Sequence, residues 1–293
     1  MSTTRIQFVF LLVPVLVAFG VAAQAPPTAP PKPAPSSPGA ASVAIPPDAD
    51  HAKEALAKSP RHGEWVDVKL ADGTKVVTWV VYPERKEKAG VVIVIHEIFG
   101  LSDWVRGVTD QLASEGFIAL APDLLSGMGP NGGGTQELGE EATKVIRNLT
   151  PEAVAARLDA VRAYALGLPA ANGKVGTVGF CWGGGASFNY AAAQPKLDAA
   201  VVFYGTSPDA AATYAKISAP VLGHYGGDDA RVDATIPTAE DEMKKLGKRY
   251  TAKIYEGAGH GFMRQQTDRD GANLKAAQQA WPATVVFFRE RLN

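Results

Sequence analysis

From about Glu64 onward, apolar and polar side chains follow a regular pattern. Trp65 to Leu70 and Lys75 to Tyr82 both alternate, and Asp72-Gly73 stands between them, which predicts a β-hairpin. Val91 to Ile95 is instead a continuous apolar run. Such a run is typical of a strand that is buried on both faces of a parallel sheet. The pattern therefore predicts a hairpin that leads into the core of a sheet.

Strands and helices alternate along the rest of the chain. Pro151 stands in the first turn of a predicted helix, where its missing N–H costs nothing. The alternation implies an α/β fold with a doubly wound, mostly parallel sheet and helices on both faces, in a single domain. A Gly-rich segment, 123–134, is predicted to be a loop. Further strands are predicted over 117–121, 175–180, 199–204, 221–225 and 251–255, and helices over 103–116, 151–168 and 271–291.

The N-terminus has the features of an export signal. Arg5 precedes an apolar run from Phe8 to Val21, and Val21-Ala22-Ala23 offers small residues for cleavage, so we predict a signal peptide over 1–23. An uncleaved anchor is the alternative, but the run is short for a membrane span. We therefore expect a periplasmic or secreted protein, with no membrane span after signal removal.

Residues 24–50 are rich in Pro and Ala and are expected to form a disordered, extended tether before a folded domain over 51–293. The chain is 46% hydrophobic, which is enough for one sizeable core. Its formal net charge is −1 and it has no basic stripe, so nucleic acid is not an expected partner. Cys181 is the only cysteine, and composition alone would favour a buried, inert thiol.

The local sequence around Cys181 reverses that interpretation. The motif Gly179-Phe180-Cys181-Trp182-Gly183-Gly184 lies between a predicted strand and a small-residue helix, which is the context of a nucleophile elbow. A phosphate-binding turn is the alternative, but the G-x-G-x-x-G spacing is missing. We predict that Cys181 is a nucleophile whose thiolate is favoured by the helix N-terminus. The backbone N–H of Trp182 would form half of an oxyanion hole.

An acid and a histidine follow in the chain order of a catalytic triad. Asp228 and Asp229 come directly after a predicted strand, and their spacing after Gly226-Gly227 favours Asp229 as the acid. Asp228 is expected to be a turn residue. His260 lies in a Gly-rich loop after the strand that ends at Tyr255, where it could act as a base.

Other ionisable residues receive different interpretations. His51 and His62 are expected at the surface, and His224 is expected to be a structural histidine. Glu97 follows a buried strand and would face the same crevice as the elbow, although it could simply cap the next helix. A metal held by His96 and Glu97 is not expected, because neighbouring strand residues point to opposite faces. No cofactor is implied.

Together, four motifs resemble the dienelactone hydrolase family, which comprises carboxymethylenebutenolidase-like α/β-hydrolases with a Cys–His–Asp triad. The resemblance covers roughly Trp65 to Leu292 and implies the α/β-hydrolase fold. The motifs are His96-Glu97-Ile98-Phe99-Gly100, Gly179-Phe180-Cys181-Trp182-Gly183-Gly184, Gly226 to Asp229, and Gly259-His260-Gly261-Phe262.

The resemblance also implies a role for each matching residue. Cys181 would be the nucleophile, His260 the base and Asp229 the acid that orients it. The backbone N–H groups of Ile98 and Trp182 would form the oxyanion hole.

Glu97 would take the thiol proton when the substrate arrives. It would be released from Arg264, which stands four residues after His260 and would otherwise bind a substrate carboxylate. Dienelactone-specific members carry a second arginine after the fourth strand, whereas residues 127–141 contain none. We do not transfer that role to Arg147, so dienelactone itself is not predicted as the substrate.

The expected activity is hydrolysis of a small-molecule lactone or activated ester through a cysteine acyl-enzyme. Peptides are not expected, because the thiolate leaves more readily than an amine when the tetrahedral intermediate collapses. A broad carboxylesterase or an acyltransferase on the same triad is the first alternative. A non-catalytic exported binding protein on the same fold is the second.

Overall fold

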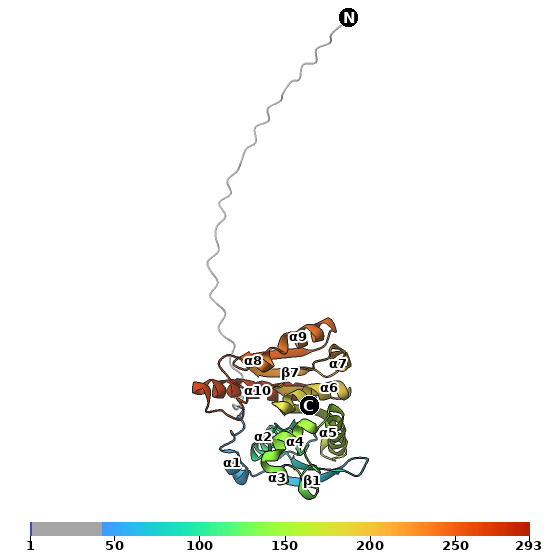
Figure 1. Cartoon of the computed structure of the whole chain (residues 1–293), viewed down its shortest axis with the longest axis vertical. Coiled ribbons are helices and arrows are strands. Elements are labelled where there is room, and N and C mark those ends of the chain that lie inside the picture. The colour runs from blue at the N-terminus through green and yellow to red at the C-terminus, as the bar shows by residue number, and fades with distance from the viewer. Residues whose placement is uncertain (2–42) are drawn as a thin grey trace, which may run out of the picture. The chain divides into compact units, whose positions relative to one another are not determined.

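The computed structural model describes Met1 and residues 43–293 (Figure 1). The predicted signal peptide and most of the predicted tether therefore lie outside the described residues. Eight strands form one sheet in the order β1-β2-β4-β3-β5-β6-β7-β8. They are β1 Gly63–Lys69, β2 Lys75–Val81, β3 Ala89–Ile95, β4 Ile118–Pro122, β5 Ala171–Phe180, β6 Ala199–Phe203, β7 Val221–Gly226 and β8 Tyr250–Tyr255.

The predicted hairpin is confirmed. β1 and β2 pair antiparallel, with Trp65 opposite Trp79, and the two indole rings lie 5.0 Å apart. Gly73 adopts a φ of +87° in the turn, a value that glycine tolerates without steric cost. β2 also pairs antiparallel with β4, and every later pair in the sheet is parallel. The predicted doubly wound, mostly parallel sheet is therefore present.

Helices cover both faces of this sheet, because each face of the central strands is apolar. On β3, Val91, Ile93 and Ile95 join one buried cluster, and Val92 and Val94 join the other. The first cluster includes residues of α5, α6 and α9, and the second includes residues of α2 and α10. The helices are α1 Ala52–Lys58, α2 Asp103–Ser114, α3 Thr135–Leu138, α4 Ala142–Val145, α5 Pro151–Leu166, α6 Trp182–Ala193, α7 Ala211–Lys216, α8 Ala230–Asp233, α9 Ile236–Lys245 and α10 Ala272–Leu292.

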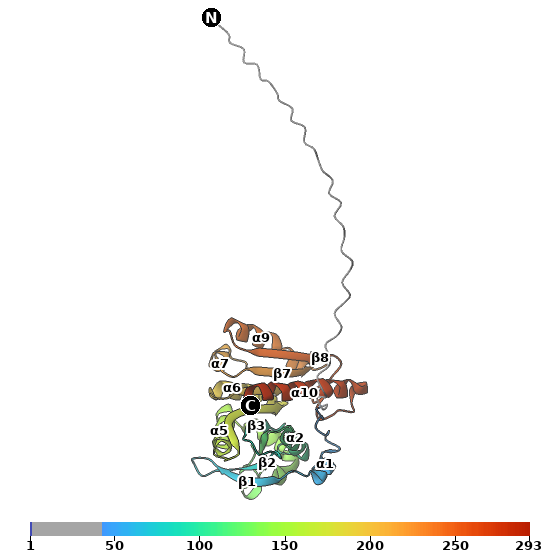
Figure 2. The same ribbon diagram turned by 180° about the vertical axis from the view of Figure 1, so that it is seen from behind.

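α10, red in Figure 2, packs against β5, β6 and β7. The carboxyl ends of the parallel strands carry the predicted site residues, since Glu97, Cys181 and Asp229 each follow a strand by one to three residues. In an open parallel sheet this edge is where ligands bind. Within the described part of the chain, no helix is both long and apolar enough to cross a membrane.

The end of the predicted tether needs correction. Residues 43–50, which we call the N-terminal strap, pack onto the domain instead of extending away from it. Val43, Ile45 and Ala49 lie against the second buried cluster, and Asp48 is buried. The compositional signal of Pro and Ala does not distinguish a solvated tether from a segment that packs through its few apolar side chains. The folded domain therefore begins eight or more residues earlier than predicted.

Candidate active site

Cys181 stands in a strained turn between β5 and α6. Its φ is +56° and its ψ is −118°, a region that non-glycine residues rarely adopt and that often marks an active site. The backbone holds this conformation through neighbouring segments, since the Cys181 N–H donates to the Phe203 carbonyl at 3.0 Å. The turn presents the thiol at the carboxyl edge of the sheet, as the predicted elbow requires.

Glycines allow the backbone to make this turn. A Cβ on Gly179 would lie 1.8 Å from the Gly183 carbonyl oxygen, and one on Gly183 would lie 2.4 Å from the carbonyl oxygens of Ile95 and His96. Neither position can hold a larger residue without moving backbone. The end of β3 is thereby pressed against the start of α6, so the segment that begins at Glu97 adjoins the elbow.

Asp229 and His260 meet as predicted. Nδ1 of His260 lies 2.5 Å from Oδ2 of Asp229, which is buried. Gly226 makes the approach possible, because a Cβ there would lie 2.6 Å from the Ala258 carbonyl oxygen. The neighbouring Asp228 instead pairs with Arg269 at 2.8 Å. The choice of Asp229 over Asp228 thus agrees with the geometry.

Glu97 and Arg264 form a buried ion pair beside the thiol. Nε of Arg264 lies 3.0 Å from Oε2 of Glu97, which is 3% exposed. The same guanidinium lies 5.0 Å from the ring centre of Phe99, an aromatic side chain that is 44% exposed. Burial raises the pKa of Glu97 to about 7, even though Arg264 acts to lower it. Glu97 can therefore exchange a proton near neutral pH. It does not cap α2, because Ser102 is the N-cap residue of that helix.

The pKa of the Cys181 thiol in the resting site is higher than the sequence suggested. Burial raises the pKa of Cys181, and the nearby Glu97 carboxylate raises it further. A backbone hydrogen bond from Trp182 acts in the opposite direction but is the weaker effect. The helix N-terminus thus favours the thiolate as expected, but burial and Glu97 outweigh it and the net pKa in the resting site is raised. Within residues 43–293, no hydrogen bond joins the Cys181 sulfur to His260.

The Trp182 N–H is directed at the Cys181 sulfur. The Ile98 N–H, which was expected to be the second donor of the oxyanion hole, makes no hydrogen bond within the described residues. Ile98 lies in the segment that Gly183 holds against the elbow.

The Trp182 ring stacks on the ring of His96, with 5.8 Å between ring centres. Both nitrogens of His96 are engaged, Nδ1 with the Glu97 carbonyl and Nε2 with the Leu124 N–H, so His96 is structural.

Tyr204 also belongs to the site, and sequence reasoning missed it. It directly follows β6, its φ is +39°, and its ring packs against His260 with 5.2 Å between ring centres. Burial raises the pKa of its hydroxyl well above the usual range, as do the charges of Glu97 and Cys181. The sequence gives one hint of this position, the glycine that follows it. Gly205 lets the backbone pass close to α6, since a Cβ there would lie 2.2 Å from the Gly185 nitrogen.

The chain's similarity to known proteins fits this geometry. Residues 76–292 match the model of the dienelactone hydrolase family. The chain belongs to this family. It is accordingly a hydrolase that acts on carboxylic ester bonds.

Individual members of the family resemble the chain over most of its length. A Saccharolobus solfataricus protein assigned as a carboxymethylenebutenolidase is 34% identical over an alignment of 253 positions, which covers 75% of this chain and 95% of that protein. A solved structure assigned as a dienelactone hydrolase from Klebsiella pneumoniae superposes with a TM-score of 0.69 at 25% identity, covering 78% of this chain and 98% of that one. The dienelactone hydrolase of Anabaena variabilis shares the fold, with a TM-score of 0.61 at 24% identity and coverage of 80% and 99%.

The remaining histidines have other surroundings. His224 is buried, bonds Tyr255 and Thr284, and has its pKa lowered to about 3 by burial, so it is structural as predicted. The exposed His51 lies beside Asp48. Among the described residues, no cluster of three or more His, Cys, Asp or Glu side chains could hold a metal.

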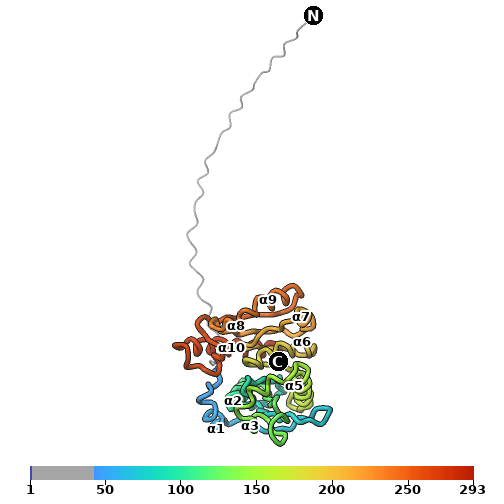
Figure 3. Tube along the Cα trace, in the orientation of Figure 1, coloured from blue at the N-terminus to red at the C-terminus, as the bar shows by residue number. Residues whose placement is uncertain are grey.

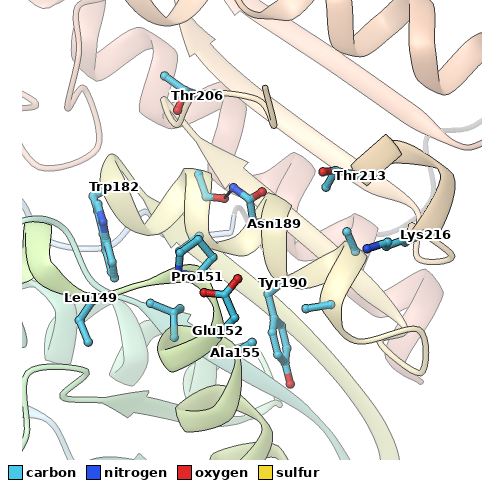
Figure 4. A pocket seen from close by; sticks show the side chains of 15 residues that line it. Leu149, Pro151, Glu152, Ala155, Trp182, Asn189, Tyr190, Thr206, Thr213 and Lys216 are labelled. Carbon is cyan, nitrogen blue, oxygen red and sulfur yellow. Dashed lines mark hydrogen bonds between the residues drawn. The ribbon is translucent and has the colours of Figure 1, made fainter. Parts of the chain in front are cut away.

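A cavity of about 540 Å³ runs along α6 (Figure 4). Trp182, the residue after Cys181, lines it, and so does Lys216. Neither Cys181 nor His260 is among its lining residues.

Proposed function

We propose that this dienelactone hydrolase homologue opens a lactone or cleaves a small activated ester through an acyl-enzyme on Cys181. The observation that carries the proposal is the strained elbow at Cys181, which is bordered by the Asp229–His260 pair and by the Glu97–Arg264 pair. An inert structural cysteine would need neither a positive φ nor these partners.

The first step is removal of the thiol proton. Glu97 is the acceptor, because its carboxyl has a pKa of about 7 and its charge acts on the thiol directly. A substrate that draws Arg264 away from Glu97 removes the positive charge that lowers this pKa, and Glu97 becomes a stronger base. The thiol therefore becomes reactive when the site is filled, which protects it in the empty enzyme.

The thiolate then attacks the carbonyl carbon. The negative oxygen receives hydrogen bonds from the N–H groups of Ile98 and Trp182. When this intermediate collapses, the carbon–oxygen bond breaks, the alkoxide takes up the proton that Glu97 accepted from the thiol, and a thioester remains on Cys181.

Water completes the cycle. His260 takes a proton from the water that attacks the thioester, while Asp229 fixes the imidazole tautomer and stabilises its cation. The carbon–sulfur bond breaks, and the sulfur takes up the proton that His260 removed from the water. Arg264, beside the exposed ring of Phe99, is the group that would hold a substrate carboxylate.

A screen of small lactones and p-nitrophenyl esters, with and without a carboxylate, tests the proposal. Wild type should hydrolyse at least one class, and Cys181→Ala should lose that activity; retained hydrolysis in the variant would refute the cysteine mechanism. Preference for carboxylated substrates supports Arg264 as their anchor. Transfer to an added alcohol or amine would indicate an acyltransferase, and a Cys181 that resists thiol-directed acylating probes would indicate a binding protein.

We also propose that the protein is exported. Arg5, the apolar run and the small residues before position 24 support this. N-terminal sequencing of the mature protein from periplasmic and culture fractions tests it, and a product that retains residues 1–23 would contradict cleavage.

A further inference from the structure

The N-terminal strap is bonded to the loop that carries His260 and Arg264. The Ala49 N–H donates to the Arg264 carbonyl at 3.0 Å. The side chain of Gln266, which is buried, donates to the Pro46 carbonyl at 2.9 Å and to the Met263 carbonyl at 3.0 Å. Figure 3 shows the blue segment before α1 beside the red loop that precedes α10.

The strap is itself anchored to the domain. Val43 and Ile45 pack against the buried cluster that contains Phe262 and Met263. Pro47 lies so close to α2 that a Cβ on Gly107 would be 3.2 Å from it. The strap therefore offers the loop a fixed support.

On its other side the same loop is held by α10. Oδ1 of Asn273 accepts from the Gly259 N–H at 2.9 Å, and its Nδ2 donates to the Gln265 carbonyl at 2.7 Å. The strap lies outside residues 76–292, which match the family model.

We propose that the strap is a positioning element of the active site and that Gln266 is its main contact, holding Arg264 against Glu97. This inference rests on the proposed function, in which the Glu97–Arg264 pair controls the thiol proton. Among the described residues, Arg264 is the charged group that acts on the pKa of Glu97, at 3.0 Å from its Oε2, and the charge of Glu97 in turn raises the pKa of Cys181 and Tyr204. A small displacement of the loop that carries Arg264 therefore changes the affinity of Glu97 for a proton.

Gln266→Ala in the full chain tests the inference. We expect kcat/KM for a p-nitrophenyl ester to fall roughly 10- to 100-fold, as misplaced catalytic groups do. The acid limb of the profile of kcat/KM against pH should also move to higher pH. A loosened Arg264 lowers the pKa of Glu97 less, so Glu97 becomes a charged base only at a higher pH. Amide exchange over 261–266 should quicken.

Asn172→Ala is the matched control. It also removes a side-chain amide bond to a backbone carbonyl, that of Leu292 at 2.7 Å, but far from this loop. The control should change neither the acid limb of the pH profile nor the rate of amide exchange over 261–266, whatever its effect on thermal stability.

Ala49→Pro provides a second route if Gln266→Ala does not fold, since it deletes the N–H that bonds Arg264, although it also fixes the backbone at residue 49. The same shift of the acid limb of the pH profile in either variant supports the inference. The inference is overturned if a folded variant keeps both the acid limb and the amide exchange over 261–266 of wild type. If wild type hydrolyses no ester or lactone, the proposed function fails, and amide exchange over 261–266 alone decides whether the strap holds the loop.

Discussion

Nε of Arg264 lies 3.0 Å from Oε2 of Glu97, yet the pKa of Glu97 is raised to about 7 instead of lowered. Burial of the carboxyl therefore outweighs its ion pair. A structural ion pair would be expected to keep the glutamate charged throughout the neutral range. This pair instead leaves Glu97 close to half-protonated at neutral pH, so a modest change in its surroundings can switch it.

Glu97 makes stability depend on pH. Because its folded pKa of about 7 exceeds the ordinary value of 4.5, the folded state binds the proton more tightly than the unfolded state. The resulting stability is fully present below about pH 4.5 and is lost as the pH rises to about 7. The loss should be roughly 3 kcal/mol, at 1.36 kcal/mol per pKa unit.

Glu97→Gln should remove this slope, because glutamine does not titrate. Denaturant unfolding between pH 5 and 8 measures it. A variant whose unfolding free energy falls with pH as steeply as that of wild type would show that Glu97 is not the titrating group.

Asp229→Asn tests the acid of the triad. The amide can accept the Nδ1–H of His260 only through its oxygen and cannot stabilise the imidazolium, so kcat should fall by up to about 10⁴-fold with little change in folding. Asp228→Asn is the matched control, since that carboxylate pairs with Arg269. Equal losses in the two variants would refute the assignment to Asp229.

The elbow can be tested through its glycines. Gly183→Ala would place a Cβ 2.4 Å from two carbonyl oxygens and should destabilise the domain by about 1–3 kcal/mol while displacing Ile98. Gly185→Ala, in the same helix, meets its nearest atom, the Thr206 carbonyl oxygen, at 3.3 Å and should cost less, because that oxygen needs to move by only a few tenths of an ångström. Thermal unfolding of both variants measures the difference, and similar stabilities would argue against the close packing.

The strands and the contact between Asp229 and His260 could be predicted because their signals lie in short motifs. Apolar runs place β3 and β5, and the glycines around Cys181 report close backbone approach. The N-terminal strap could not be predicted, because its contacts with Gln266 join residues 220 positions apart. Tyr204 was missed for a similar reason, since its partner His260 comes from a distant loop. The pKa of Cys181 depends on burial, which a motif at a helix N-terminus does not reveal.

Removing Glu97 should affect two reactions of Cys181 in opposite directions. In the resting enzyme the Glu97 carboxylate raises the pKa of the thiol, so Glu97→Gln should lower that pKa and speed alkylation by iodoacetamide at pH 8. Ester hydrolysis should slow in the same variant, because the proton acceptor is lost. Alkylation and turnover rates measured on one preparation check both effects. Rates that fall together would mean that Glu97 assists the thiol even without substrate, and turnover that stays unchanged would leave His260 as the acceptor of the thiol proton.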